Sequence, residues 1–165
     1  MDSTQMSMKD WMDVFRGATE EVAKSALRFD GAGPAAPAGK SAVKEPGAPY
    51  GAFISIAADS ASMHLGLSTT QEGCRALARS LLGMRTAVAI TDEEVGDAVS
   101  ELMNIIAGKV KSRVSDRDQS LRLGLPMFMK GEIQVGGGME RQSAEVQLGP
   151  VACQLQVFRR NRAAA

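Results

Sequence analysis

The sequence predicts an α+β fold in which helices cover one face of an antiparallel sheet. Three segments, 8–29, 68–84 and 91–114, carry apolar residues at helical spacing, and short alternating or β-rich runs stand in groups between and after them. Grouped strands favour antiparallel pairing over a parallel sheet of single βαβ units. A chain of 165 residues is also long enough to bury a core without stapling by disulfides or metals.

The first 29 residues are predicted to contain one amphipathic helix, 8–29. Its apolar positions repeat every three or four residues and are Trp11, Val14, Phe15, Ala18, Val22 and Leu27. Glycine, alanine and proline dominate the next stretch, 30–49, which is therefore expected to be a linker or mobile loop. The AGKS within it is rejected as a phosphate-binding loop, because Pro34 stands where that motif needs its first glycine.

Two β-rich runs, 53–57 and 62–67, predict a hairpin around the polar ADSA. His64 falls inside the second run. It is expected to be a packed or surface strand residue rather than a catalytic one.

Capping signals place the two helices that follow. Thr69, with Glu72 three positions later, predicts a capping box, and Gly83 predicts the end of that helix. Thr91 with Glu94 is the same signal at the start of the next helix.

Three further strands are expected at 120–135, 141–150 and 151–160, with GGGME as a flexible connection after the first. The main domain is accordingly placed at 50–158. The residues after it, 159–165, are basic or alanine and are expected to form a solvated tail.

Charge and composition limit the classes of partner. Nineteen basic and 19 acidic residues give a formal charge of zero, and no basic stripe interleaves with aromatic residues, so no nucleic-acid or membrane-surface binding is expected. No apolar run reaches the roughly 20 residues of a membrane span, which indicates a cytoplasmic protein. Cys74 and Cys153 are then expected to be reduced and partly buried, and a chain whose only histidine is His64 is not expected to bind a metal.

The candidate site is one polar face of the helix 91–114. At about 100° per residue, Asp97, Glu101, Asn104 and Gly108 fall within an arc of roughly 60°. The opposite side is an apolar stripe suited to packing on a sheet, made of Val95, Val99, Leu102, Met103, Ile106 and Val110. An ordinary solvent-facing helix could carry the same polar residues. However, asparagine and glycine are poor mid-helix choices, which favours a docking surface that a partner approaches closely.

The spacing Asp97, Glu101, Asn104 and then 21 residues to Pro126 resembles the signature of the CheC, CheX and FliY phosphatases of bacterial chemotaxis. The NIIAG around it, the hairpin leading to LGLS and the helix ending in SLLGM are also similar to that family, over about 50–158. CheC and FliY carry two copies of the motif. The single E-x-x-N here resembles the CheX-like branch, which is characteristically homodimeric through its sheet.

The resemblance implies a CheX-like layer arrangement and hydrolysis of the phosphoaspartate on a CheY-like response regulator. Mg²⁺ is expected on the regulator, with no cofactor bound by this chain. Asn104 is expected to position the attacking water, and Glu101 to dock a cationic side chain of the regulator. Asp97 and Gly108 are expected to contact the partner at the edge of the site, and Pro126 to shape a strand beneath it.

Two other functions stay open on the sequence. A binding module of the same fold would recognise a phosphorylated regulator, or another signalling protein, without hydrolysis. A structural or assembly protein would use its strands for oligomerisation and carry the polar helix face incidentally. If the protein is structural, mutation of Glu101 or Asn104 should cause no measurable loss of activity.

Overall fold

The computed structural model describes residues 6–29, 49–59, 61–85, 87–134 and 136–161. Its elements, in chain order, are α1 Met8–Ala26, β1 Tyr50–Ala57, β2 Ala61–Thr69, α2 Gln71–Leu82, α3 Asp92–Val114, β3 Arg122–Leu123, β4 Met127–Lys130, β5 Met139–Leu148 and β6 Val151–Asn161. The six strands form one antiparallel sheet in the order β3-β1-β2-β6-β5, with β4 also paired to β1. The predicted α+β class is confirmed.

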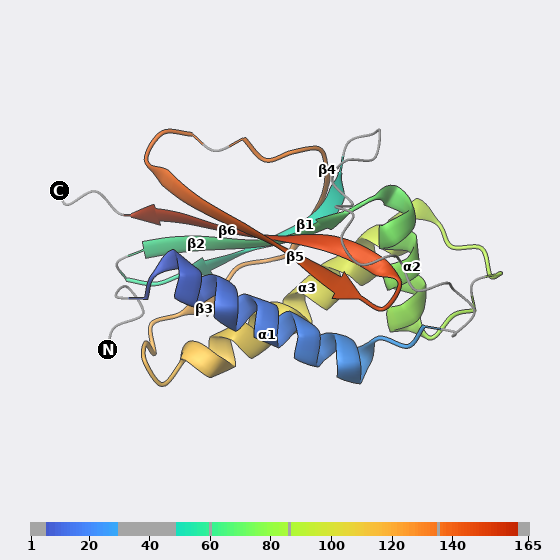
Figure 1. The fold of residues 1–165 in the computed structure, drawn as a ribbon, viewed down its shortest axis with the longest axis horizontal. Helices are drawn as coiled ribbons and strands as arrows, with labels where there is room; N and C mark the ends of the chain where they lie inside the picture. The colour runs from blue at the N-terminus through green and yellow to red at the C-terminus, as the bar shows by residue number, and fades with distance from the viewer. Residues whose placement is uncertain (1–5, 30–48, 60, 86, 135, 162–165) are drawn as a thin grey trace.

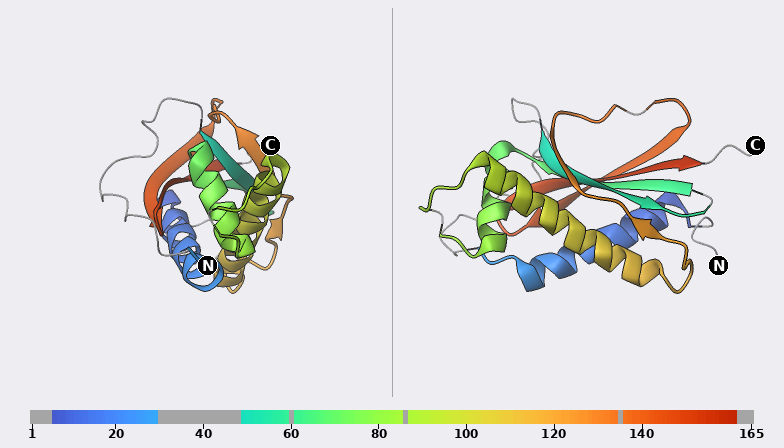
Figure 2. Two further views of the ribbon diagram at one scale, coloured as in Figure 1. Left: turned by 90° about the vertical axis from the view of Figure 1, so that its right-hand side faces the viewer. Right: turned by 180° about the vertical axis from the view of Figure 1, so that it is seen from behind.

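Helices α1 and α3 lie together against one face of the sheet, and α2 sits at one end of it (Figures 1 and 2). Alternate residues of the central strands point into the core beneath these helices, among them Ile54, Ile56, Leu65, Leu67, Leu155 and Val157. From α1, Trp11, Phe15 and Val22 enter the same core, so this helix belongs to the domain rather than to an appendage. Among the described residues, no helix is long and apolar enough to cross a membrane.

The predicted hairpin is present. Strands β1 and β2 pair along their whole length, with Tyr50 opposite Thr69 and Ala57 opposite Ser62. His64 lies in the middle of β2 and is half-buried, as expected of a strand residue. Its partial burial lowers the pKa of the imidazole.

The start of α2 differs by one residue from the prediction. The N-cap is Thr70, whose hydroxyl accepts a hydrogen bond from the Gly73 amide at 2.9 Å. The predicted capping box of Thr69 and Glu72 is wrong, because Thr69 ends β2 and its hydroxyl donates instead to a backbone carbonyl of β6. The end of the helix is as predicted, with Gly83 in the left-handed conformation at φ 67°.

The strand predicted over 120–135 is wrong as a single element, because it is divided into β3 and β4. Leu123 pairs with Ile56 and Met127 pairs with Phe53, so the three residues 124–126 stand opposite the two residues 54–55 of β1. One extra residue on an edge strand makes a bulge that interrupts the ladder. The bulge ends at Pro126, just before β4, where the missing amide hydrogen removes a ladder donor.

The tail predicted at 159–165 begins too early, because β6 continues to Asn161 and pairs with both β2 and β5. The guanidinium of Arg159 donates to the Met6 carbonyl at 2.8 Å and forms an ion pair with Glu140 at 2.7 Å. A basic run that resembles a tail by composition is therefore held by sheet pairing. The remainder of that prediction, and the predicted linker apart from Pro49, fall outside the described residues.

Cys74 on α2 and Cys153 on β6 are both free and buried. Burial raises the pKa of the Cys74 thiol to about 12, and burial raises the pKa of Cys153 as well. The sequence predicted free thiols that are partly buried, and the structure buries them further.

Candidate functional site

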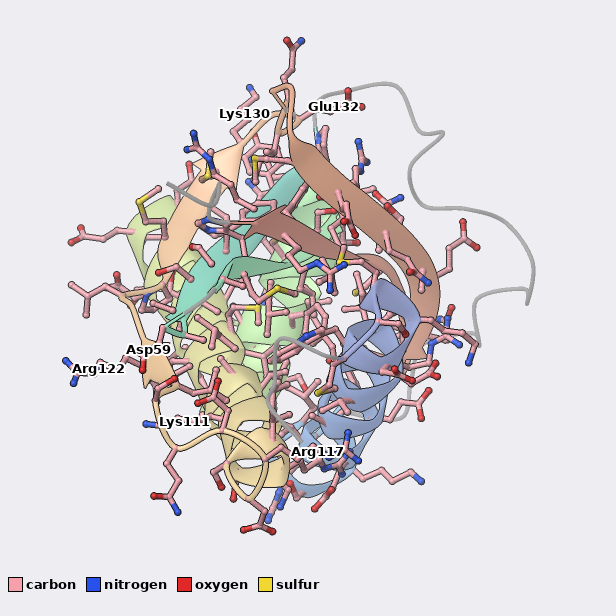
Figure 3. The ribbon with its side chains drawn as sticks, turned by 90° about the vertical axis from the view of Figure 1, so that its left-hand side faces the viewer. Asp59, Lys111, Arg117, Arg122, Lys130 and Glu132 are labelled. Carbon is pink, nitrogen blue, oxygen red and sulfur yellow. The ribbon has the colours of Figure 1, made fainter. Side chains whose placement is uncertain are left out.

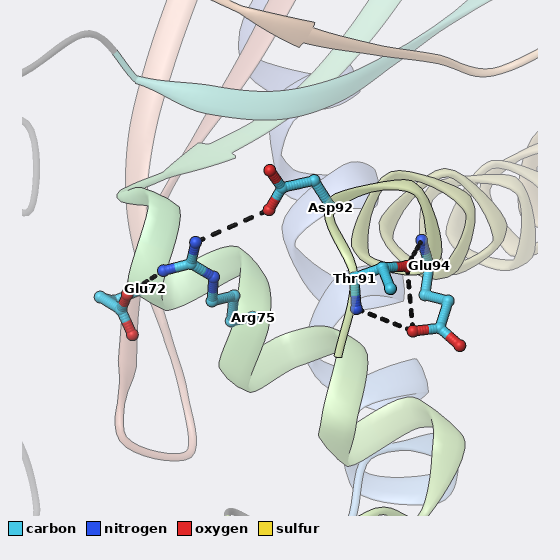
Figure 4. Close-up of polar contacts among 5 residues, drawn as sticks. All are labelled: Glu72, Arg75, Thr91, Asp92 and Glu94. Carbon is cyan, nitrogen blue, oxygen red and sulfur yellow. Dashed lines mark hydrogen bonds and ion pairs between the residues drawn. The ribbon is translucent and has the colours of Figure 1, made fainter. Parts of the chain in front are cut away.

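Helix α3 is held at its start by side chains of its own first turn and of α2 (Figure 4). The Thr91 hydroxyl accepts a hydrogen bond from the Glu94 amide at 3.2 Å, and the Glu94 carboxylate accepts one from the Thr91 amide at 2.8 Å. These hydrogen bonds keep the pKa of Glu94 below its ordinary value. Arg75 of α2 lies between Glu72 and Asp92, 3.6 Å from the Asp92 carboxylate. The predicted capping box is confirmed, and α2 is tied to the start of α3.

The apolar side of α3 sets the rotation of the helix. All six residues of the predicted stripe are buried against the sheet: Val95, Val99, Leu102, Met103, Ile106 and Val110. Because each residue advances the helix by about 100°, burial of this stripe turns the opposite arc toward solvent.

The four predicted site residues share that outward arc. Asp97 and Glu101 are exposed, Asn104 is half-buried, and Gly108 is partly exposed. Within the described ranges, the three side chains make no hydrogen bond or ion pair. Other charged residues of α3 do have partners, since Lys109 and Arg113 both pair with a glutamate of α1. Elsewhere on α3, charged side chains such as these have partners within the molecule. On the outward arc, Asp97, Glu101 and Asn104 have none among the described residues.

The residue types on this arc suit binding and orientation. Glu101 and Asn104 are i,i+3 neighbours on the helix surface and can contact one ligand group together. The Asn104 carboxamide both donates and accepts hydrogen bonds without carrying charge, whereas an ionised Glu101 only accepts them. In the described part of the chain, no group of three or more His, Cys, Asp or Glu side chains is placed to hold a metal.

Gly108 has no packing role among the described residues. A Cβ built at this position meets no atom within 4 Å, apart from the helix itself. At Gly96, earlier on the same helix, a Cβ would lie 3.3 Å from the ring of Phe128. Internal packing therefore explains the glycine at 96 and not the one at 108, which agrees with a surface kept open for a partner.

The arc is flanked by the β3–β4 edge of the sheet, since α3 contacts both of these strands. Lys111 lies one turn beyond Gly108 on the same side of α3 and has no ion pair with a described residue. Figure 3 shows Lys111 and Arg122 of β3 extending on the same flank of the molecule. Helix α3 and the β3–β4 edge thus lie side by side, and Lys111 and Arg122 mark the same flank of the molecule.

Sequence reasoning missed two features of this surface. Lys111 could have been placed on the arc from the sequence, because it falls at about −40° on the helical wheel that places Asp97 at zero. The closeness of the β3–β4 edge had no local signal, since it follows from how those strands pair with β1.

The six-stranded antiparallel sheet covered by helices, with a carboxylate and a carboxamide on the outward arc of α3, defines an α+β domain that can be compared with known families. The model of the family described as chemotaxis phosphatase CheX matches residues 50–136, which is more than half of the chain. The matched segment includes β1 to β4 and the whole of α3. The chain belongs to the CheX family.

Solved structures with the same fold cover nearly the whole chain. A CheC-like superfamily protein from Shewanella sp. PV-4 has a TM-score of 0.68 at 17% identity, covering 94% of this chain and 100% of that one. Chemotaxis protein CheX from Vibrio vulnificus has a TM-score of 0.63 at 15% identity, covering 94% and 99%. The CheX of a CheX–CheY–BeF3–Mg²⁺ complex from Borrelia burgdorferi has a TM-score of 0.63 at 20% identity, covering 92% and 99%. At these identities the similarity concerns the fold, and the predicted CheX-like arrangement of layers is confirmed. No curated protein matches the chain significantly.

Proposed function

We propose that this chain hydrolyses the phosphoaspartate of a CheY-like response regulator. The proposal is carried by the Glu101 and Asn104 side chains on the outward arc of α3, which have no partner among the described residues, in a chain of the CheX family. A CheX of similar fold is known in complex with CheY, BeF3 and Mg²⁺, which supports a receiver domain as the partner.

Asn104 positions the attacking water in this proposal. The water oxygen attacks phosphorus, the bond from phosphorus to the aspartyl oxygen breaks, and the products are the free carboxylate and inorganic phosphate. Such a transfer passes through a loose transition state, so an in-line water contributes more than a strong base. A neutral carboxamide can hold that water without repelling the phosphoryl oxygens, and its half-buried position restricts its motion.

Glu101 docks the regulator. Its exposed carboxylate lies about one turn from Asn104, where it can pair with a cationic side chain beside the phosphoaspartate. Asp97 lies a further turn toward the start of α3 and adds negative charge at the edge of the contact. Gly108 leaves room for the regulator backbone.

The metal belongs to the regulator, where Mg²⁺ offsets the charge of the phosphoryl group. We further propose that the protein is a homodimer joined through its sheet. Strand β5 has ten residues and pairs only with β6 among the described strands, so its other edge offers unpaired backbone groups. Sedimentation of the purified protein at twice the monomer mass would support the dimer.

The test is the decay of a radiolabelled, phosphorylated CheY-like regulator in the presence of Mg²⁺, with buffer, wild type, Asn104→Ala or Glu101→Ala. Asn104→Ala is expected to bind the regulator normally and to lose most of the acceleration, about 100-fold in kcat, as for loss of one positioning group. Glu101→Ala is expected to weaken both binding and turnover, because the docking contact is lost.

Glu20→Gln is the matched control, since it alters an exposed carboxylate on α1, outside the outward arc of α3. It should keep most of the activity. Equal decay with wild type and Asn104→Ala would refute the assignment. Binding of the regulator with an unchanged phosphoryl lifetime would identify a binding module instead.

A further inference from the structure

The outward arc of α3 continues onto an apolar edge of the sheet. Among the large apolar side chains of the described residues, Leu125 is the most exposed at 87%, followed by Met127 at 59%. Leu125 lies in the bulge between β3 and β4, and Met127 is the first residue of β4. A leucine so exposed, with a second apolar side chain two residues away, is a feature of interaction sites when it adjoins a functional surface.

The register of the sheet places this segment beside the site. Phe128 of β4 pairs with Ala52 and lies against Gly96 of α3, whereas Leu123 of β3 pairs with Ile56. The four residue steps along β1 from Ala52 to Ile56 correspond to about 13 Å. Figures 1 and 2 show that α3 and β1 run in the same direction, each starting at the end of the domain near α2.

Along α3, about 13 Å corresponds to about nine residues, which leads from Gly96 to Ile105. The connection between Leu123 and Phe128 therefore runs alongside the part of the helix that carries Glu101 and Asn104. Lys111 and Arg122, on the same flank in Figure 3, extend that surface toward the end of α3.

We propose that Leu125 is an apolar anchor for the receiver domain of the phosphorylated regulator, so that the docking surface includes the β3–β4 bulge as well as α3. This inference rests on the proposed function, and it adds the apolar chemistry of the contact. The receiver domain must present an apolar side chain near its phosphoaspartate to meet Leu125. Pro126 limits the conformations of the bulge, so that little conformational entropy is lost when Leu125 is buried.

The outward arc of α3 and the β3–β4 edge carry charge of both signs. Glu101 and Asp97 provide the negative side of the surface, and Lys111 and Arg122 the positive side. An apolar patch together with charged residues of both signs is the ordinary composition of a transient protein interface. The occupant that this composition fits is a folded domain with both a cation and an apolar side chain beside its phosphorylation site.

The test measures the affinity of a purified CheY-like receiver domain, carrying BeF3⁻ and Mg²⁺ as a stable phosphoryl mimic, for wild type and Leu125→Ser. Loss of one buried leucine contact is expected to raise Kd about tenfold. With the phosphorylated domain as substrate, KM should rise by a similar factor while kcat stays within about twofold, because Leu125 does not touch the reacting atoms. Leu125→Met should restore most of the affinity.

Leu82→Ser is the matched control, because Leu82 is also an exposed leucine, at 52%, and ends α2 away from the β3–β4 bulge. It should bind like wild type, and all three variants should melt like wild type. The inference is overturned if Leu125→Ser binds within twofold of wild type, or if Leu82→Ser loses as much affinity.

The two hypotheses fail in different ways. Acceleration that depends on Asn104 but not on Leu125 would refute the anchor and leave the phosphatase standing. Binding that depends on Leu125 without any acceleration would refute the phosphatase and leave the docking surface standing. Absence of binding to every activated CheY-like regulator of the cell would refute both.

Discussion

Asn104 differs from the other polar residues of the outward arc in being half-buried while its carboxamide has no partner among the described residues. A partly desolvated amide without a partner costs free energy, and a bound water or ligand group would recover it. Glu101 is exposed, where water already solvates its carboxylate. Burial and residue type therefore support the two proposed roles: Asn104 holds a water, and Glu101 docks the regulator.

Substitution of Asn104 by aspartate separates shape from charge. Asn104→Asp keeps the size of the side chain but places a negative charge beside the phosphoryl oxygens, so kcat is expected to fall by at least about tenfold. Single-turnover decay of the phosphorylated regulator at saturating protein measures the change. Activity equal to wild type would show that a neutral carboxamide is not required.

Among the elements, α3 combines a strongly held interior side with an open exterior. Its capping box, its link through Arg75 to α2 and its six-residue stripe hold the helix on the sheet. The exterior includes Gly108, a residue that weakens a helix by about 1 kcal/mol relative to alanine. Among the described residues, no atom outside the helix backbone would meet a Cβ at this position, so internal packing gives no reason for the glycine.

Replacement of Gly108 is expected to raise stability and lower affinity together. Gly108→Ala should raise the free energy of unfolding by up to about 1 kcal/mol, measured in urea. Gly108→Leu should also fold stably, since the site is open, but should raise KM for the phosphorylated regulator because the side chain occupies the docking surface. Gly96→Ala is the control, and it should be less stabilising, because the added methyl presses on Phe128. An unchanged KM in Gly108→Leu would place the regulator elsewhere.

For the whole molecule, α1 and α3 are joined at the surface by Glu21. Its carboxylate pairs with Lys109 at 2.7 Å and with Arg113. Arg113 also lies against Gly17 of α1, where a Cβ would come within 2.7 Å of its guanidinium. The glycine therefore leaves room for the arginine where α1 and α3 meet.

The contribution of Glu21 should depend on pH. Hydrogen bonds from Lys109 and then Arg113 lower the pKa of the Glu21 carboxyl below its ordinary value of 4.5. A lowered folded-state pKa means that the stabilisation is present above the unfolded value and is lost as the pH falls through the folded value. Glu21→Gln should thus melt at a lower temperature than wild type at neutral pH, and the difference should shrink in acid. Glu20→Gln, on an exposed neighbour, should show neither effect; a Glu21→Gln deficit that persists in acid would contradict the linkage.

Local patterns predicted much of the fold. The box of Thr91 and Glu94, the stop at Gly83 and the two sides of α3 were all readable, because each depends on residues within a few positions of one another. The errors arose where pairing between distant segments decides. By local pattern Thr69 resembles a helix cap, but in the structure it is the last residue of β2. The basic end of β6 resembles a tail by composition, but it pairs with β2 and β5.

The sequence by itself determined which side of α3 faces solvent and which residues stand there, since the periodicity of one helix is a local property. It determined the family as well, because the spacing of Asp97, Glu101, Asn104 and Pro126 lies within the matched segment. Only the tertiary structure decided what stands beside that helix. Leu125 comes 21 residues after Asn104 in the chain, and the register of β3 and β4 on β1 carries the bulge that contains it back along α3.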